Sequence, residues 1–284
     1  MNPIISSKNH SLTLSDGTSW TIVSKGQKSL EFSEILAKTM RLHLSPQAIP
    51  KLLILNKSSI ARTDEKPIFS EKTLKSVTGN NKVTCQITPS RDHAAKVAQL
   101  LELSQIFCCK AEERGGLAIH GALAEKNGSG IILAGRGDVG KTTASKRLPS
   151  PWISLSDDCS LIVLDKQKKY RAHPWPTWSS LVDEKKLETW DVQYSMPLKA
   201  IFILNQGKTD KVESIGKGHA ACLLTAAADQ AWWGLDEKLP DKEKLALRTK
   251  RFKNICSLVE SIPVFLLDIS LKGSFWKEIE KVLP

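Results

Sequence analysis

The chain has 284 residues, of which 41% are hydrophobic and 25% charged, a composition that suits one large or two modest globular domains. A formal net charge of +11 favours anionic partners, but the lysines are scattered and no RNP, helix-turn-helix or zinc motif is present, so nucleic acid is not expected as a partner. No apolar run is long enough to span a bilayer and no secretory signal is visible, so the sequence predicts a cytoplasmic protein with no membrane partner.

Residues 1–90 are predicted to form a small α+β domain. An alternating segment turns at Asp16-Gly17, which is a strong hairpin signal. Apolar residues at helical spacing predict a helix over 29–44, and KLLILN (51–56) and KVTCQITP (82–89) are typical of strands. Residues 56–80 are polar and rich in turn formers. This domain is a candidate for docking a substrate or peptide.

Residues 91–284 follow the pattern of a nucleotide-binding α/β domain. A long helix begins near Ser90, the expected N-cap, and stops at Gly115-Gly116. Further strands and helices then alternate. The strands are predicted at 117–126, 131–135, 152–158, 160–165, 199–205 and 264–271. A short helix is predicted from Lys141, directly after the loop, and longer helices at 218–233, 241–262 and 274–283.

The six cysteines include no CxxC pair, which favours reduced, mostly buried thiols over disulfides or a zinc site.

A phosphate-binding loop follows the apolar strand GIILAG. Its residues fit the pattern G-x-x-x-x-G-K-[ST], in which glycines let backbone N–H groups surround a phosphate. Lys141 would reach the β- and γ-phosphates of ATP and the Thr142 hydroxyl would bind Mg²⁺. The predicted nucleotide-binding residues are Gly135, Arg136, Gly137, Asp138, Val139, Gly140, Lys141, Thr142 and Thr143.

Asp138 brings a carboxylate into this loop, next to phosphates. We expect it to point to solvent or to touch the second substrate, with Arg136 offsetting its charge. The helix after the loop is short, because Pro149 and Pro151 end it.

Asp157 and Asp158 end the next apolar strand. Neighbouring residues of an extended strand point to opposite faces, whereas a bend would let both face the loop. Kinase chemistry needs one carboxylate to accept the hydroxyl proton and others to hold the metal. We therefore expect this strand to bring the pair to the loop from the neighbouring position in the sheet. Asp165 also ends an apolar strand, and we interpret it as structural.

The order AIHGAL, GRGDVGKTT, LSDDCSLIVL resembles the catalytic domain of the HPr kinase/phosphorylase family, whose fold is related to phosphoenolpyruvate carboxykinase. The resemblance implies a mixed sheet with flanking helices. It makes Asp157 the general base, Asp158 a supporting or metal-binding residue, and His120 a neighbour that tunes their charge. It leaves open the oligomeric state and whether a reverse, phosphorylase reaction occurs.

The segment AHPWPTWSS (172–180) is similar to the smaller HPr-kinase-related proteins of peptide-modification cassettes, namely the SynChlorMet cassette protein and peptide-tailoring kinases. The arginine-bearing segment that HPr kinases carry near the C-terminus is missing, which argues against HPr as the substrate. Candidate acceptor-site residues are His173, Trp175, Thr177 and Trp178, with a rigid loop over the sheet as the alternative. Arg248 and Arg251, three residues apart, are candidates for steadying the transferred phosphate.

The sequence thus predicts an ATP-dependent kinase that phosphorylates a hydroxyl of a ribosomal peptide or of a small serine-like molecule. The alternative is an ATP-binding module without catalysis that recruits a peptide within a modification cassette.

Overall fold

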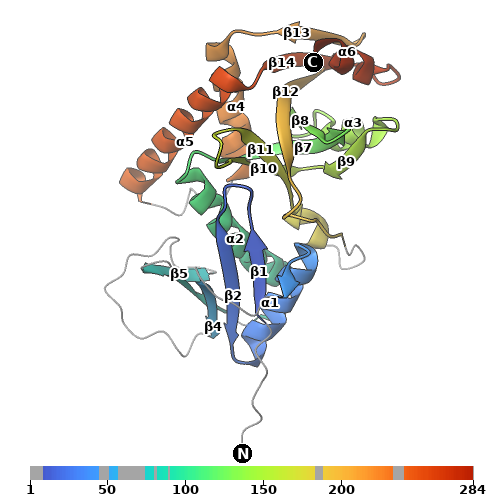
Figure 1. Cartoon of the computed structure of the whole chain (residues 1–284). Helices are drawn as coiled ribbons and strands as arrows, with labels where there is room; N and C mark the ends of the chain where they lie inside the picture. The colour runs from blue at the N-terminus through green and yellow to red at the C-terminus, as the bar shows by residue number, and fades with distance from the viewer. Residues whose placement is uncertain are drawn as a thin grey trace, which may run out of the picture. The chain divides into compact units, whose positions relative to one another are not determined.

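The computed structural model describes residues 9–44, 51–56, 74–79, 82–88, 90–182, 188–232 and 240–283, with the backbone path alone for 51–56 and 74–79. The chain divides into two compact units (Figure 1). Unit 1 comprises Met1–Phe107 and Trp178–Gln193, and unit 2 comprises Cys108–Thr177 and Tyr194–Pro284. The range 1–90 lies inside unit 1, which extends further along the chain and includes a second, later segment.

Unit 1 contains a six-stranded mixed sheet in the order β3-β1-β2-β4-β6-β5. β2, β4 and β6 are parallel, and the remaining pairs are antiparallel. The elements are β1 (His10–Thr13), β2 (Ser19–Lys25), α1 (Gln27–Thr39), β3 (His43–Leu44), β4 (Lys51–Asn56), β5 (Leu74–Gly79), β6 (Lys82–Ile87), α2 (His93–Glu112, which continues into unit 2) and the 3₁₀ helix η2 (Trp178–Val182).

The hairpin at Asp16-Gly17 and the strands at 51–56 and 82–87 are confirmed. The helix predicted over 29–44 ends at Thr39, and His43–Leu44 instead pairs with β1. Residues 74–79 form a strand within a stretch predicted as turn-rich; 57–73 lie outside the described residues. Asp92 rather than Ser90 caps α2, because its Oδ1 accepts a hydrogen bond from the backbone N–H of Ala94 at 3.1 Å.

Unit 2 is built on a large mixed sheet in the order β11-β10-β7-β8-β12-β14-β13, with β9 also paired to β7. β12 runs parallel to both β8 and β14, and its first residues also pair with β11. The strands are β7 (Leu117–Lys126), β8 (Ser129–Ala134), β9 (Ile153–Ser156), β10 (Cys159–Leu164), β11 (Tyr170–Trp175), β12 (Met196–Gln206), β13 (Lys211–Ser214) and β14 (Val264–Ile269). The helices are α3 (Lys141–Arg147), α4 (Lys217–Ala231), α5 (Asp241–Ser261) and α6 (Phe275–Val282).

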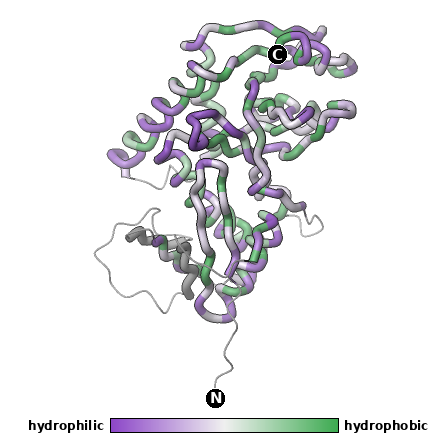
Figure 2. Tube along the Cα trace, in the orientation of Figure 1, coloured by the Kyte–Doolittle hydropathy of each residue, from purple (hydrophilic) through white to green (hydrophobic). Residues whose placement is uncertain are grey.

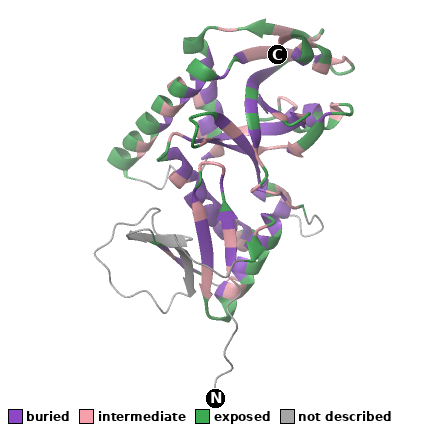
Figure 3. Ribbon diagram, in the orientation of Figure 1, coloured by how far each residue is buried: buried purple, intermediate pink, exposed green. Residues whose placement is uncertain are grey.

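Helices cover both faces of this sheet. Alternate residues of β7 explain the two layers: Leu117, Ile119 and Leu123 join the core that includes α4 and α5, whereas Ala122 and Ala124 join the core that includes α3 and α6. The central strands β7 and β8 are almost entirely buried, as is the middle of β12 (Figure 3), as expected for strands covered on both sides. α5 is mainly hydrophilic (Figure 2) and buries only a narrow stripe that includes Ile255 and Leu258.

Unit 2 confirms the prediction of a mixed sheet with flanking helices, and the helices at 217–231, 241–261 and 275–282. The short helix after the loop is also confirmed: α3 has seven residues, and the chain turns at once, with the backbone N–H of Trp152 donating to the Pro149 carbonyl at 2.9 Å. Segment 172–180, for which a rigid loop was the alternative to an acceptor site, is not a loop throughout, because residues 172–175 belong to β11.

Candidate functional site

β7 is the scaffold of the candidate site. On one side its Gly121 pairs with Ala134, the last residue of β8, after which the loop begins. On the other side Leu123 pairs with Ser156 of β9 and His120 pairs with Cys159 of β10. Asp157 and Asp158 occupy the break between β9 and β10. The pair is therefore delivered across β7, and the prediction that it comes from the strand beside β8 is wrong.

Gly121 is needed for this arrangement. A Cβ at this position would come within 2.7 Å of the Ile132 side chain and 3.2 Å of the Leu133 carbonyl oxygen. A larger residue would therefore force the Ile132 side chain or the backbone of β8 to shift, at the position next to His120.

The loop from Gly135 to Gly140 has the backbone freedom that the sequence suggests. Gly140, the residue before α3, has φ of +100°, a left-handed conformation that favours glycine. A Cβ at Gly137 or Gly140 would meet nothing within 4 Å, so these positions border open space. Asp138 is exposed at φ of +60°.

Lys141 is buried and its ammonium lies across the loop. Its Nζ donates to the carbonyl oxygens of Gly135 at 3.1 Å and Arg136 at 2.8 Å. Burial lowers the pKa of Lys141, and the nearby charges of Asp158 and Asp138 oppose this shift. Thr142 and Thr143 start α3 and are exposed. Because this ammonium lies beside open space, an anion bound there could replace the two carbonyls as its partner.

Asp158 and His120 form an ion-pair contact beside this lysine. His120 Nε2 lies 2.9 Å from Asp158 Oδ1, and the Asp158 side chain keeps 42% of its exposure. The hydrogen bond from His120 lowers the pKa of Asp158; burial opposes this, and the charges of His120 and Lys141 reinforce it. Asp158 is therefore an ionised, partly solvated carboxylate next to the loop.

Asp157 is held by a different partner. Thr177, which is buried, donates from Oγ1 to Asp157 Oδ1 at 2.7 Å. The bend thus sends the two carboxylates to separate partners, Thr177 and His120. Thr177 was expected in the acceptor site, and the structure places its hydroxyl on the candidate base instead.

The other predicted acceptor residues are divided between a buried strand of unit 2 and unit 1. His173 and Trp175 belong to β11 and are fully buried, with relative exposures of 0% and 1%. Trp178 belongs to unit 1, where its indole N–H donates to Ser104 Oγ at 2.9 Å. The structure therefore does not gather these side chains around an open pocket in unit 2.

The two candidate arginines of α5 have different environments. Arg248 is exposed. Arg251 is buried in an ion-pair cluster: its Nη1 donates to Asp229 at 3.0 Å, its Nε to Glu112 at 3.3 Å, and its guanidinium lies 4.9 Å from the Trp232 ring centre. Trp232 also donates to Glu112 at 2.9 Å. These contacts assign the Arg251 guanidinium to the packing of α5 and not to the loop.

Two polar residues that the sequence analysis did not select support the site. Ser160 donates to the Gly121 carbonyl at 2.8 Å and holds the chain just after the aspartates against β7. Gln206 donates to the Asp138 backbone oxygen at 3.4 Å. Gln206 ends a strand parallel to β8, and such strands bring their carboxyl ends to one edge, so it could have been predicted.

The free thiols differ in exposure: Cys85 and Cys108 are buried, Cys109, Cys159 and Cys256 are half-buried, and Cys222 is exposed. Cys159, opposite His120, is a neutral thiol because burial raises its pKa to about 12. Within the described ranges, no three His, Cys, Asp or Glu side chains gather as a ready-made metal site. Mg²⁺ fits Thr142 and Asp158 only as an ion that keeps water and phosphate oxygens as its other ligands.

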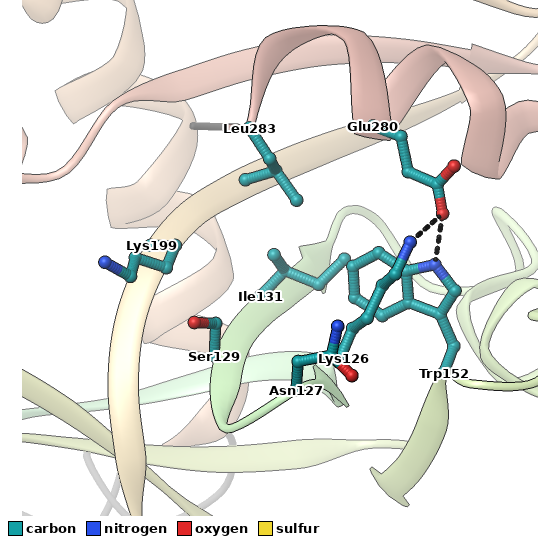
Figure 4. A pocket seen from close by; sticks show the side chains of 8 residues that line it. All are labelled: Lys126, Asn127, Ser129, Ile131, Trp152, Lys199, Glu280 and Leu283. Carbon is teal, nitrogen blue, oxygen red and sulfur yellow. Dashed lines mark hydrogen bonds and ion pairs between the residues drawn. The ribbon is translucent and has the colours of Figure 1, made fainter.

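A cavity of about 280 Å³ lies at the opposite end of β8 (Figure 4). Trp152 and Ile131 form apolar walls, and Glu280 accepts hydrogen bonds from Lys126 at 2.6 Å and from the Trp152 indole at 3.0 Å. These bonds lower the pKa of Glu280. The cavity is separate from the loop, because Ser129 begins β8 and the loop follows its last residue.

The fold defines a mixed α/β protein whose large sheet carries a glycine-rich loop opposite an aspartate pair. The family model of the SynChlorMet cassette protein ScmC matches residues 83–284, so the chain belongs to this family. No curated protein matches the chain. Among the described helices, none combines the length and apolar character that a membrane span requires.

Proposed function

We propose that the protein is an ATP-dependent kinase that transfers the γ-phosphate to a hydroxyl, on a serine or threonine of a ribosomal peptide or on a small serine-like molecule. One observation carries the proposal: β7 has the Lys141 loop on one side and the break with Asp157 and Asp158 on the other. The similarity of these motifs to the HPr kinase family, and membership in a cassette family, support it.

In this proposal the loop from Gly135 to Thr143 holds the phosphates. Lys141 would exchange its bonds to the loop carbonyls for bonds to phosphate oxygens. This exchange costs little, because the ammonium is already desolvated. Bound Mg²⁺ would supply charge neutralisation, with Thr142 and Asp158 as its protein ligands. His120 would hold Asp158 in place through their 2.9 Å contact.

Asp157 would act on the acceptor. Its Oδ1 accepts the Thr177 hydrogen bond, which leaves Oδ2 to take the proton of the acceptor hydroxyl. The hydroxyl oxygen then forms a bond to the γ-phosphorus while the bond between that phosphorus and the bridging oxygen of ADP breaks. The products are a phosphate ester, ADP and a proton that leaves through Asp157. We infer that this chemistry takes place in the cytoplasm, where ATP is available.

The test is transfer from γ-labelled ATP to peptides encoded beside the gene and to free serine. Asp157→Asn should reduce kcat by about 10²–10⁴-fold, the usual contribution of a general base, and should leave ATP binding intact. Asp241→Asn, the same change at an exposed position of α5, should keep full activity. If Asp157→Asn transfers phosphate at the full rate, the assignment of Asp157 as the base is wrong. Tight ATP binding by the wild type without transfer would favour the peptide-recruitment module instead.

A further inference from the structure

Unit 1 contains a cavity of about 330 Å³ that none of the predicted site residues forms. Its volume lies at the small end of the range of about 300–1,000 Å³ typical of ligand sites. The main lining residues are Ile35, Lys38, Lys96, Val97, Leu100 and Leu181, and we call this cavity the unit 1 pocket.

Two helices and a returning segment of chain form its walls. Residues 35, 38 and 39 share one face of α1, and residues 93, 96, 97 and 100 share one face of α2, as helical spacing requires. The third wall is formed by residues 181, 188 and 189, and hydrogen bonds from this segment connect it to both helices. The Trp190 N–H donates to the Thr39 carbonyl at 2.8 Å, Arg41 Nε donates to Thr189 Oγ1 at 2.8 Å, and His93 Nε2 donates to the Leu181 carbonyl at 2.7 Å.

The lining combines an apolar floor with a basic rim. Val97 and Leu100 are buried with exposures of 4% and 2%, whereas Ile35 is 43% exposed although its side chain is large and apolar. Lys38 and Lys96 have no carboxylate partner within the part of the chain that the structure describes. Glu188 is the acidic residue of the lining. An apolar group attached to an anionic chain satisfies both features.

We propose that the unit 1 pocket binds an apolar side chain within an acidic segment of the acceptor peptide, and so docks that peptide. The inference rests on the proposed function only in taking the acceptor to be a peptide. The third wall belongs to the segment 178–193, which begins directly after Thr177, the residue that donates to Asp157. Docking therefore touches a stretch of chain that continues directly from Thr177, the hydrogen-bond donor to the candidate base.

Fluorescence anisotropy of the full-length protein with a short labelled peptide, in which leucines stand among glutamates, tests this proposal without nucleotide. Lys38→Glu/Lys96→Glu should weaken binding about tenfold or more, because two attractive charges become repulsive. The matched control Lys28→Glu/Lys82→Glu reverses two exposed lysines of unit 1 outside the pocket and should bind within about twofold of wild type. Ile35→Gln should weaken binding while the exposed position keeps the fold intact.

Three results would overturn the proposal: no binding by the wild type, equal losses in both double variants, or unchanged binding when alanine replaces the leucines of the peptide. Sedimentation of the protein without peptide tests whether a second copy of the chain occupies the unit 1 pocket. A mass that falls only in Lys38→Glu/Lys96→Glu would assign the pocket to self-association and would also overturn it.

The outcomes separate docking from catalysis. Peptide binding with no transfer from ATP would support the docking site and contradict the kinase proposal. Transfer to free serine with no peptide binding would support the kinase proposal and contradict the docking site.

Discussion

Unit 2 contains two clusters of charged side chains that differ in one respect, access to open space. In the first, Asp158 pairs with His120 near Lys141, and the aspartate keeps 42% exposure beside a glycine loop. In the second, Arg251 is 1% exposed and Glu112 3%, and their partners surround them. The first cluster can exchange its protein contacts for those of a ligand. The second can only hold α5 against the sheet. Ion pairing alone therefore does not indicate chemistry.

Among changes to these two clusters, loss of the Lys141 ammonium should give the largest effect on transfer. We expect Lys141→Ala to reduce kcat by about 10²–10³-fold, as for other preorganised charges that stabilise a transition state. The melting temperature should not fall in this variant, because burial makes the charged form of Lys141 unfavourable in the folded protein. The control is Lys146→Ala, an exposed lysine of the same helix. A clear fall in the melting temperature would place Lys141 with the structural cluster.

Loss of Arg251 should have the opposite result, a large effect on stability rather than on transfer. Arg251→Met leaves Glu112 buried without its cation, which typically costs about 3–5 kcal/mol of the free energy of unfolding. The melting temperature should fall by on the order of 10 °C. Arg248→Met, at an exposed position three residues earlier, should change stability by less than about 0.5 kcal/mol. Denaturant unfolding measures both. If Arg251→Met folds normally and loses only transfer, the buried cluster belongs to the chemistry after all.

Thr177 tests how Asp157, the candidate base next to the first cluster in the chain, is held. Thr177→Val keeps the shape and removes the hydrogen bond to Asp157, so kcat should fall about tenfold while the KM for ATP stays the same. Thr177→Ser keeps the hydroxyl and should restore most of the rate. Equal rates for the valine and serine variants would show that the hydroxyl has no part in positioning the base.

The smallest expected effect concerns pH. Because His120 lowers the pKa of Asp158 below the ordinary value of 3.8, this contact contributes stability at higher pH that is lost as the pH falls below that value. The advantage of the wild type over Asp158→Asn in acid unfolding should therefore disappear at low pH. Solvent exposure keeps the effect small. An advantage that grows towards acid would contradict the assigned sign.

Local signals in the sequence were sufficient for most elements and for the loop. The Asn127-Gly128 turn, with both residues at positive φ, and the strand before Gly135 are short-range features that pattern rules describe well. The short helix follows equally from Pro149 and Pro151. His43–Leu44 was misassigned because its strand identity depends on pairing with β1, which is far away in the chain.

Side-chain contacts between residues far apart in the chain could not be predicted from the sequence. Nothing local distinguishes Arg248 from Arg251, and only the packing of α5 against Glu112 buries one of them. Thr177 and Asp157 are 20 residues apart, and they meet because β10 and β11 form a hairpin. The aspartate pair reaches the loop through the break between β9 and β10, a feature of register that hydrophobic periodicity does not report.

The path of the chain through residues 178–193 has a practical consequence for dissecting the protein. A fragment that begins at Cys108 keeps every strand of the large sheet, yet it also keeps Trp178, Leu181, Trp190 and Val192, whose burial is in unit 1. Without the N-terminal residues these side chains would form an apolar surface that favours aggregation. Removing residues 1–107 is therefore not a clean way to isolate the sheet; replacing 178–193 by a short polar linker would have to accompany it.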